Sequence, residues 1–186
     1  MKKLMIALAA VAVATVVQAA SINWGVTGNT WTYDDATKAA QNTTVYLINA
    51  ASWSTIEAAI QGGATSFTTA DAGILAVGKT ANAKGAVTTS TATSASLVAG
   101  TSYNYAYLVF DTRDTEDVKY FASATTSKAA YDPTNPTYAE TQTISFDATH
   151  YSTSGLSNGW QSVPEPTSGL LLVLGMAGLA LRRKRA

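Results

Sequence analysis

The sequence predicts a mainly β protein: a single antiparallel β-sandwich with one short helix, flanked by a separate apolar segment at each end. Three observations carry this prediction. Residues 20–163 contain 26 threonines and 15 serines but only 17 charged residues, and threonine fits a pleated sheet well. Short apolar or aromatic segments recur there with the two-residue period of strands, and turn signals separate them. We therefore expect seven or more strands in a jelly-roll-like or immunoglobulin-like arrangement.

The strongest predicted strand covers residues 103–111. Side chains alternate between the two faces of a strand. One face would carry Ala106, Leu108 and Phe110, and the other Tyr103, Tyr105, Tyr107 and Val109. Because both faces are apolar or aromatic, we expect a central strand, paired in an antiparallel hairpin with residues 118–124.

Two further strands are expected at residues 43–48 and 141–147, the latter with Ile144 and Phe146 on its inner face. Ser54 and Glu57 form a capping-box pattern that opens the one predicted helix, which stops at Gly62. Residues 132–136 contain two prolines and should form an irregular loop. Weaker strand candidates are residues 22–24, 30–33, 64–69, 74–77, 85–91 and 160–163.

The N-terminal segment is typical of a secretory signal peptide. Lys2 and Lys3 precede an apolar run at residues 4–17, and small residues follow it. This pattern predicts cleavage after Ala19, with a cut after Ala20 as the alternative. A first transmembrane helix is disfavoured because the run is short and rich in alanine and valine. The chain is therefore expected to be exported.

The C-terminal segment has three parts in a fixed order: Pro164-Glu165-Pro166, an apolar stretch at residues 167–181, and a basic cluster. The cluster consists of Arg182, Arg183, Lys184 and Arg185. This order resembles the PEP-CTERM sorting signal of Gram-negative bacteria. The resemblance implies that an exosortase in the inner membrane processes the signal and frees the protein to the cell surface or exopolysaccharide matrix. It covers only this tail and implies nothing about the fold of the remainder.

Physical arguments support this interpretation of the tail. Fifteen helical residues would span roughly 22 Å, short of the ~30 Å hydrocarbon core. The basic cluster would be held on the cytoplasmic side, and the prolines would keep the motif extended outside the membrane. The alternative is a plain anchor that is never cut. We thus divide the chain into a signal peptide (1–19), a β-sandwich domain (20–163) and a sorting signal (164–186).

The charge balance changes once both ends are set apart. Residues 20–163 hold six basic and eleven acidic residues, a net charge of −5. An acidic domain argues against nucleic acid as a partner. The absence of cysteine excludes disulfides and thiolate metal sites.

Residues 73–80 satisfy the phosphate-loop pattern G-x-x-x-x-G-K-[ST], with Gly73, Gly78 and Lys79 at the fixed positions. Such a loop follows a strand and opens a helix, whose N-terminal N–H groups meet the phosphates. Here residues 74–77 are themselves strand-like, and residues 81–85 make a poor helix. We interpret the segment as a buried strand that ends in a turn.

Two other groups of residues are candidates for chemical sites. Asp111, Asp114, Glu116 and Asp117 could offer oxygen ligands to Ca²⁺, but the spacing is not that of an EF-hand and basic residues intervene, so a solvated turn is favoured. His150 is the only histidine, and no serine or aspartate can be placed near it for a catalytic triad. Neither group predicts a metal or catalytic site.

The aromatic residues leave two interpretations open. Four tryptophans and nine tyrosines could form a sugar-binding face or pack in the core, and the stripe of Tyr103, Tyr105 and Tyr107 is the most regular case. An outward stripe would be a binding platform, whereas an inward stripe would be core. Asn42-Thr43-Thr44 matches the N-glycosylation pattern, a weak signal in a bacterial protein. The tryptophans counted among these aromatic residues are Trp24, Trp31, Trp53 and Trp160.

Two function classes follow. The first is an exported surface or matrix protein without catalytic activity or cofactor, processed by an exosortase, passing transiently through the inner membrane, with exopolysaccharide as a candidate partner. The second is a small exported hydrolase acting on glycans or esters. The sequence shows no nucleophile or metal constellation, and no pair of carboxylates is nominated for glycoside hydrolysis. This favours the first class.

Overall fold

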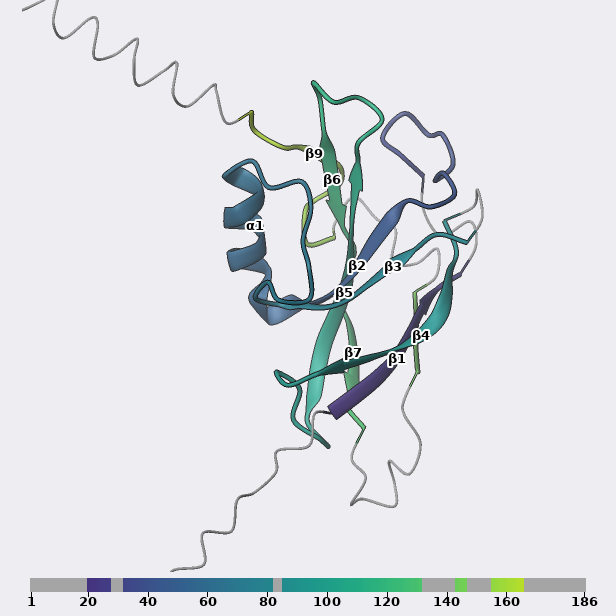
Figure 1. The fold of residues 1–186 in the computed structure, drawn as a ribbon, viewed down its shortest axis with the longest axis vertical. Coiled ribbons are helices and arrows are strands. Elements are labelled where there is room, and N and C mark those ends of the chain that lie inside the picture. The colour runs from purple at the N-terminus through teal and green to yellow at the C-terminus, as the bar shows by residue number, and fades with distance from the viewer. Residues whose placement is uncertain (1–19, 28–31, 82–84, 132–142, 147–154, 166–186) are drawn as a thin grey trace, which may run out of the picture.

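The computed structural model describes residues 20–27, 32–81, 85–131, 143–146 and 155–165 (Figure 1). These residues form a mainly β fold with two sheets and one short α-helix. Several predictions concern residues outside these ranges: the signal peptide and Ala19, Trp31, the proline-containing loop, His150, Pro166, the apolar tail and the basic cluster.

The smaller sheet has three strands in the order β4-β1-β8. Its central strand β1 (Ala20–Val26) pairs antiparallel with β4 (Val87–Ser94) and parallel with β8 (Thr143–Phe146). The prediction of a wholly antiparallel sandwich is therefore wrong at this pair. A parallel neighbour requires a long crossover connection, and turn signals in the sequence do not indicate where such a crossover ends.

The larger sheet has the order β3-β2-β5-β6-β9, and β7 also pairs with β5. All of its pairings are antiparallel, and β5 and β6 form the expected hairpin. Its strands are β2 (Thr44–Asn49), β3 (Ile74–Lys79), β5 (Ser102–Asp111), β6 (Lys119–Ala122), β7 (Thr126–Ala129) and β9 (Gln161–Ser162).

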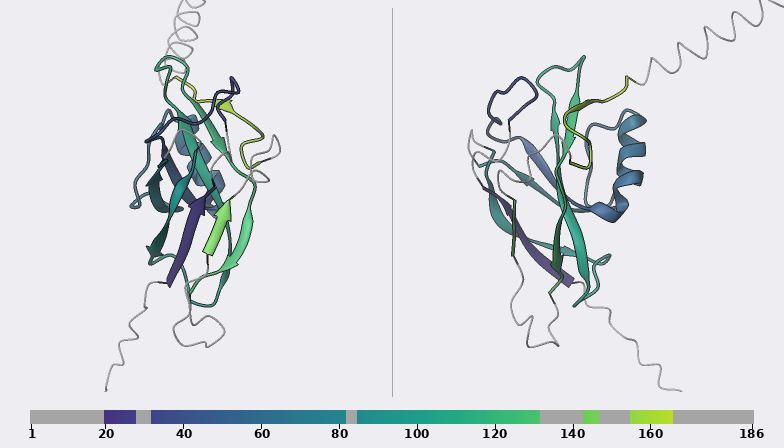
Figure 2. Two further views of the ribbon diagram at one scale, coloured as in Figure 1. Left: turned by 90° about the vertical axis from the view of Figure 1, so that its right-hand side faces the viewer. Right: turned by 180° about the vertical axis from the view of Figure 1, so that it is seen from behind.

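The larger sheet separates two hydrophobic clusters. The smaller sheet covers one of its faces and helix α1 (Trp53–Gln61) covers the other (Figure 2). The alternation predicted for β5 is confirmed: Tyr105 and Tyr107 pack towards the smaller sheet, whereas Leu108 and Phe110 pack towards the helix. The ring of Tyr107 lies 5.2 Å from that of Phe146 on the smaller sheet. The packing of one sheet on the other agrees with the predicted sandwich architecture.

The predicted helix exists, but it begins differently. A 3-10 turn (Ala50–Ser52) precedes α1, and the Asn49 side chain accepts a hydrogen bond from the Ala51 N–H. Ser54 lies inside α1, so the predicted capping box is wrong. The helix ends at Gly62 as expected, and its buried residues Ile56 and Ile60 lie one turn apart and face the sheet.

Other strand predictions need correction. Residues 64–69 form no strand, because the Thr68 N–H bonds to the Asp71 carboxylate and the Asp71 N–H returns to the Thr68 carbonyl. That exchange closes a turn. Of the strand expected at residues 30–33, the described part makes only an isolated bridge between Thr32 and Lys38. Strand β7 was not predicted.

Candidate functional site

The end of the described chain is joined firmly to the larger sheet. Strand β9 pairs with β6, and the Val163 N–H then donates to the Val118 carbonyl at 2.8 Å. Just before β9, the Trp160 ring packs against Tyr33 and Phe121 with centroids 5.9 and 5.7 Å away. Its indole N–H donates to the Thr32 carbonyl at 3.1 Å. The folded domain therefore extends to Val163.

Pro164 and Glu165 follow Val163 directly and are exposed. They border a small groove of about 90 Å³ that also involves Glu116 and Val118 of the hairpin between β5 and β6. The start of β1 and the described segment that follows β9 lie towards opposite ends of the long axis (Figure 1). The Pro-Glu segment thus follows strand β9 and Val163 directly, at one end of the domain.

Asp34 and Asp35, which lie just after Tyr33, anchor the β5–β6 hairpin. Asp34 forms an ion pair with Lys119 at 2.8 Å. Asp35 pairs with Arg113 at 3.1 Å, and Arg113 also pairs with Asp111 at 2.6 Å. The pairs made by Asp35 and Asp34 join residues 78 and 85 positions apart. They fasten the loop after Tyr33 to the hairpin.

Arg113 is saturated with hydrogen bonds. The Nε and Nη2 atoms each donate one hydrogen bond to Asp111. Both Nη atoms also donate to Asp35, and Nη1 donates to the Thr37 hydroxyl at 2.7 Å. A guanidinium has five N–H donors, so these contacts occupy all of them. The Arg113 carbon Cζ lies 3.8 Å above the Tyr33 ring centroid, a cation–π contact.

This network sets the protonation of its members. Hydrogen bonds from Arg113 and then Thr37 hold the pKa of Asp35 well below its usual range. Burial by itself would raise the pKa of Asp111, but the hydrogen bonds from Arg113 outweigh it and the pKa is lowered. The same two carboxylates raise the pKa of Arg113. All three groups therefore stay charged at neutral pH.

The acidic cluster of Asp111, Asp114, Glu116 and Asp117, the candidate Ca²⁺ ligands, takes part in contacts within the hairpin. Asp111 binds Arg113, and Asp117 lies 3.6 Å from Lys119 and accepts from the Ser162 hydroxyl. Asp114 accepts from the Glu116 N–H within the turn. In the described ranges no group of three or more histidine, cysteine or acidic side chains is placed to hold a metal ion.

The phosphate-loop pattern forms a strand, as interpreted from the sequence, but the expectation that this strand is buried holds only for Ile74 and Leu75, because β3 lies at the edge of its sheet and Val77 is 43% exposed. Residues 74–79 are β3, and Gly73 turns the chain into it with φ +85°. A Cβ at Gly73 would lie 2.4 Å from that of Ser52, so the glycine serves close packing. The Thr80 hydroxyl is buried and donates to the Ala40 carbonyl. Within the described residues, this arrangement presents no cradle for a phosphate.

The tyrosine stripe on β5 points inward, which resolves the open alternative in favour of core. Tyr105 and Tyr107 are fully buried and Tyr103 packs against the same cluster. Trp24 is also fully buried, whereas Trp53 and Trp160 are partly buried. Across the part of the chain that the structure describes, the exposed large apolar side chains are valines, Val77 and Val98.

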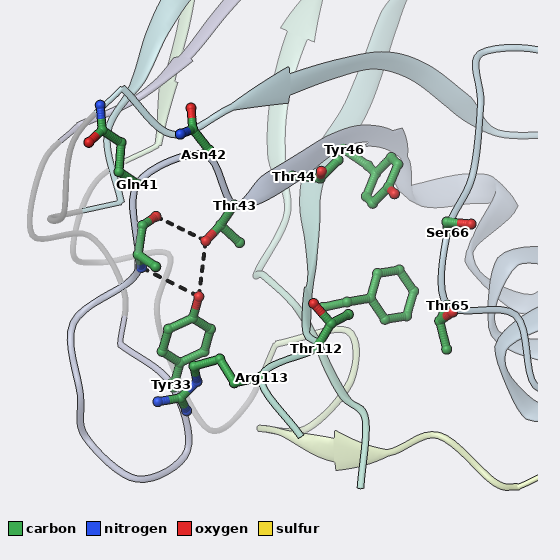
Figure 3. Close-up of a pocket in the computed structure, with 12 residues that line it drawn as sticks. Tyr33, Gln41, Asn42, Thr43, Thr44, Tyr46, Thr65, Ser66, Thr112 and Arg113 are labelled. Carbon is green, nitrogen blue, oxygen red and sulfur yellow. Dashed lines mark hydrogen bonds between the residues drawn. The ribbon is translucent and has the colours of Figure 1, made fainter. Parts of the chain in front are cut away.

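A pocket that the sequence did not indicate lies near the start of β2, with a volume of about 510 Å³ (Figure 3). Tyr33 and Thr43 line one side, Thr65 and Ser66 lie opposite, and Thr44, Tyr46 and Thr112 lie between them. Three separate segments, far apart in the chain, contribute these side chains. Its full lining is Tyr33, Ala40, Gln41, Asn42, Thr43, Thr44, Tyr46, Thr65, Ser66, Phe110, Thr112 and Arg113.

The side of the pocket around Tyr33 is held rigidly. The Tyr33 hydroxyl lies 3.0 Å from the Thr43 hydroxyl and accepts from the Ala40 N–H, and Thr43 in turn donates to the Ala40 carbonyl. The Thr43 N–H donates to the Thr80 hydroxyl at 2.9 Å. This closed set of bonds fixes the turn that leads into β2.

Among the described residues, no helix is both long enough and apolar enough to cross a membrane.

Comparison with known proteins identifies the tail. Residues 162–185 match the family model of the PEP-CTERM protein-sorting motif. The match begins within β9 and includes Pro164 and Glu165. No curated protein and no solved structure matches the chain.

The motif makes this chain an exosortase-targeted, exported protein of the cell surface or extracellular space, as the sequence predicted. It is a PEP-CTERM sorting domain-containing protein, in which the motif accounts for the tail alone.

Proposed function

We propose that this protein is a non-catalytic surface or matrix module that is associated with polysaccharide after an exosortase has released it. The observation that carries the proposal is the PEP-CTERM motif at the end of a folded β domain. The motif supplies the route out of the cell, and the domain at residues 20–163 is the cargo. The sandwich would be jelly-roll-like or immunoglobulin-like.

In this proposal each end of the chain has one task. Signal peptidase cuts after Ala19, and the apolar segment at residues 167–181 holds the protein transiently in the inner membrane. Pro164, Glu165 and Pro166 are the recognition element for the exosortase, and residues 182–185 stop translocation. The exposure of Pro164 and Glu165 supports this role, because a processing enzyme needs access to an extended segment.

The direct connection between the folded domain and the motif has a consequence for processing by the exosortase. Val163 is still bonded to Val118, so the exosortase would meet the domain itself beside the motif. Before release, the hairpin between β5 and β6 would lie next to the enzyme and the membrane surface. The start of β1 would point away, since it lies at the opposite end of the domain.

A non-catalytic role is supported by how the charged groups are used. Arg113, Asp35 and Asp111 satisfy one another, which leaves that network little capacity for acid–base chemistry. The processed protein should therefore bind polysaccharide in an array and leave model glycosides and esters uncut. Turnover that a single Asp or Glu substitution abolishes would replace this proposal with the hydrolase alternative.

A further inference from the structure

We propose that the pocket beside β2 binds a neutral saccharide unit. This inference rests on the polysaccharide part of the proposed function and names the site and the ligand class. The pocket volume of about 510 Å³ lies in the range of small-molecule sites, roughly 300–1,000 Å³. One or two sugar rings fit a space of that size.

The pocket offers hydroxyl groups that the fold does not use. Thr44, Thr65, Ser66 and Thr112 line it, and none of these four hydroxyls bonds to another group within the described ranges. Each hydroxyl can donate one hydrogen bond and accept two. A ligand whose own groups both donate and accept would complement this set, and sugar hydroxyls do both.

An apolar surface accompanies the hydroxyls. Tyr46 and Phe110 line the pocket with ring centroids 6.0 Å apart in an edge-on arrangement. The Tyr46 hydroxyl accepts from the Phe67 N–H, which fixes the ring. Tyr46 is 4% exposed and Phe110 is 5% exposed, so these rings close the floor of the pocket and offer a sugar only a small apolar contact. The hydroxyl groups therefore carry the recognition.

The electrostatics select a neutral ligand. Arg113 is the one charged residue of the lining, and its five donors are already taken by Asp35, Asp111 and Thr37. With two carboxylates around one guanidinium, the network carries a net charge of −1. The network therefore offers no free cationic donor to an anionic sugar, and its net negative charge repels such a ligand.

The site is preorganised. Asn42 adopts φ +64° at the turn into β2, and its N–H donates to the Thr80 carbonyl at 2.9 Å. Thr80 is itself buried and bonded to the Ala40 carbonyl. A pocket wall that is already ordered loses little conformational entropy when a ligand binds. Thr65 also borders the groove beside Pro164 and Glu165, so the pocket lies at the end of the domain that carries the sorting motif.

The test is protein-observed NMR titration of the ¹⁵N-labelled processed protein with glucose, galactose, N-acetylglucosamine and their β-linked disaccharides, and with glucuronate. We expect at least one neutral sugar to shift the amide resonances of Thr44, Thr65, Ser66 and Thr112. Thr44→Val and Thr112→Val should each weaken that binding about threefold to tenfold. Thr93→Val is the matched control, since Thr93 is an exposed strand residue on β4 outside the pocket, and it should leave the affinity unchanged.

Thr65→Trp provides a second test at an exposed position, where a large ring should close the pocket and abolish the shifts without unfolding the domain. The inference is overturned if no sugar in the panel shifts these amides at tens of millimolar, if the shifts lie elsewhere, or if glucuronate binds more tightly than the neutral sugars. Any of these results leaves exosortase processing intact, because the mass of the released protein reports that step separately.

Discussion

The Val163 N–H donates to the Val118 carbonyl at 2.8 Å, and Pro164 is the next residue. A main-chain hydrogen bond of the sheet thus stands directly beside the first residue of the Pro-Glu-Pro segment. Sorting and folding share this short segment, since the matched motif begins at Ser162 inside β9. Substitutions before Val163 should therefore affect the stability of the fold, whereas substitutions after it should affect sorting.

The anchoring role of Trp160 can be tested by Trp160→Ala. The ring is partly buried and contacts Tyr33 and Phe121, and its N–H bonds to the Thr32 carbonyl. Full burial of such a ring is worth about 3–5 kcal/mol on truncation, so a partly buried one should cost about 2 kcal/mol. Urea unfolding measures this change. Val98→Ala is the control, because Val98 is 57% exposed and should change stability by less than about 0.5 kcal/mol.

Two buried tyrosine hydroxyls should respond oppositely to removal. The Tyr105 hydroxyl has no hydrogen-bond partner in the described ranges, and burial, followed by the charge of Tyr103, raises its pKa to about 12. Tyr105→Phe removes a desolvated polar group and should leave stability unchanged or raise it by about 1 kcal/mol.

Tyr33→Phe is the comparison, since that hydroxyl bonds with Thr43 and Ala40. Its loss should cost about 0.5–1.5 kcal/mol. Thermal unfolding of both variants at one pH measures the difference, and a larger loss in Tyr105→Phe than in Tyr33→Phe would contradict the assigned contacts.

The Arg113 network should make stability depend on acid. The folded-state pKa values of Asp35 and Asp111 are lowered by Arg113, so the unfolded chain binds protons first as pH falls. The stabilisation from these carboxylates is fully present above about pH 4 and declines below it, towards their folded pKa values.

Arg113→Met should lower the melting temperature at pH 7 and flatten its decline between about pH 4 and pH 2. Lys79→Met is the control, because Lys79 is exposed on β3 and has no ion pair among the described residues. Equal slopes for the Arg113 variant and the original protein would show that the network does not govern acid stability.

The sequence predicted those features that depend on local periodicity. The alternation along residues 103–111 was sufficient to assign Tyr105 and Leu108 to opposite faces, because a strand has a fixed period and both faces are buried. Gly62 ended the helix as expected. The tail was recognisable because its signal is linear and needs no fold.

Features set by distant contacts were not predictable. Asp35 and Arg113 are 78 positions apart, and no local pattern links them. Strand β7 carries no alternation of large apolar side chains, since its sequence is Thr-Ser-Lys-Ala. The pocket beside β2 likewise draws its lining from three separate segments, so it exists only after the chain has folded.

The domain should fold without its two terminal segments. Residues 21–163 include both hydrophobic clusters except for Ala20. The apolar segments at the two ends are expected to be targeting signals and not parts of the core. We expect a monomer with a β-type far-UV spectrum and a cooperative transition. Reducing agent should not shift its melting temperature, because the chain has no cysteine. A random-coil spectrum would show that the terminal segments are needed for folding.

The most direct test of exosortase processing is the intact mass of the protein recovered from the cell surface, compared between the original chain and Glu165→Ala. The original should lack residues 1–19 and the apolar tail, with the second cut at or near Pro164-Glu165-Pro166. Glu165→Ala should fold but remain in the inner membrane with its tail attached, because Glu165 is exposed and lies beyond strand β9, outside both hydrophobic clusters. Surface protein that still carries residues 182–185, or normal release of Glu165→Ala, would contradict the account.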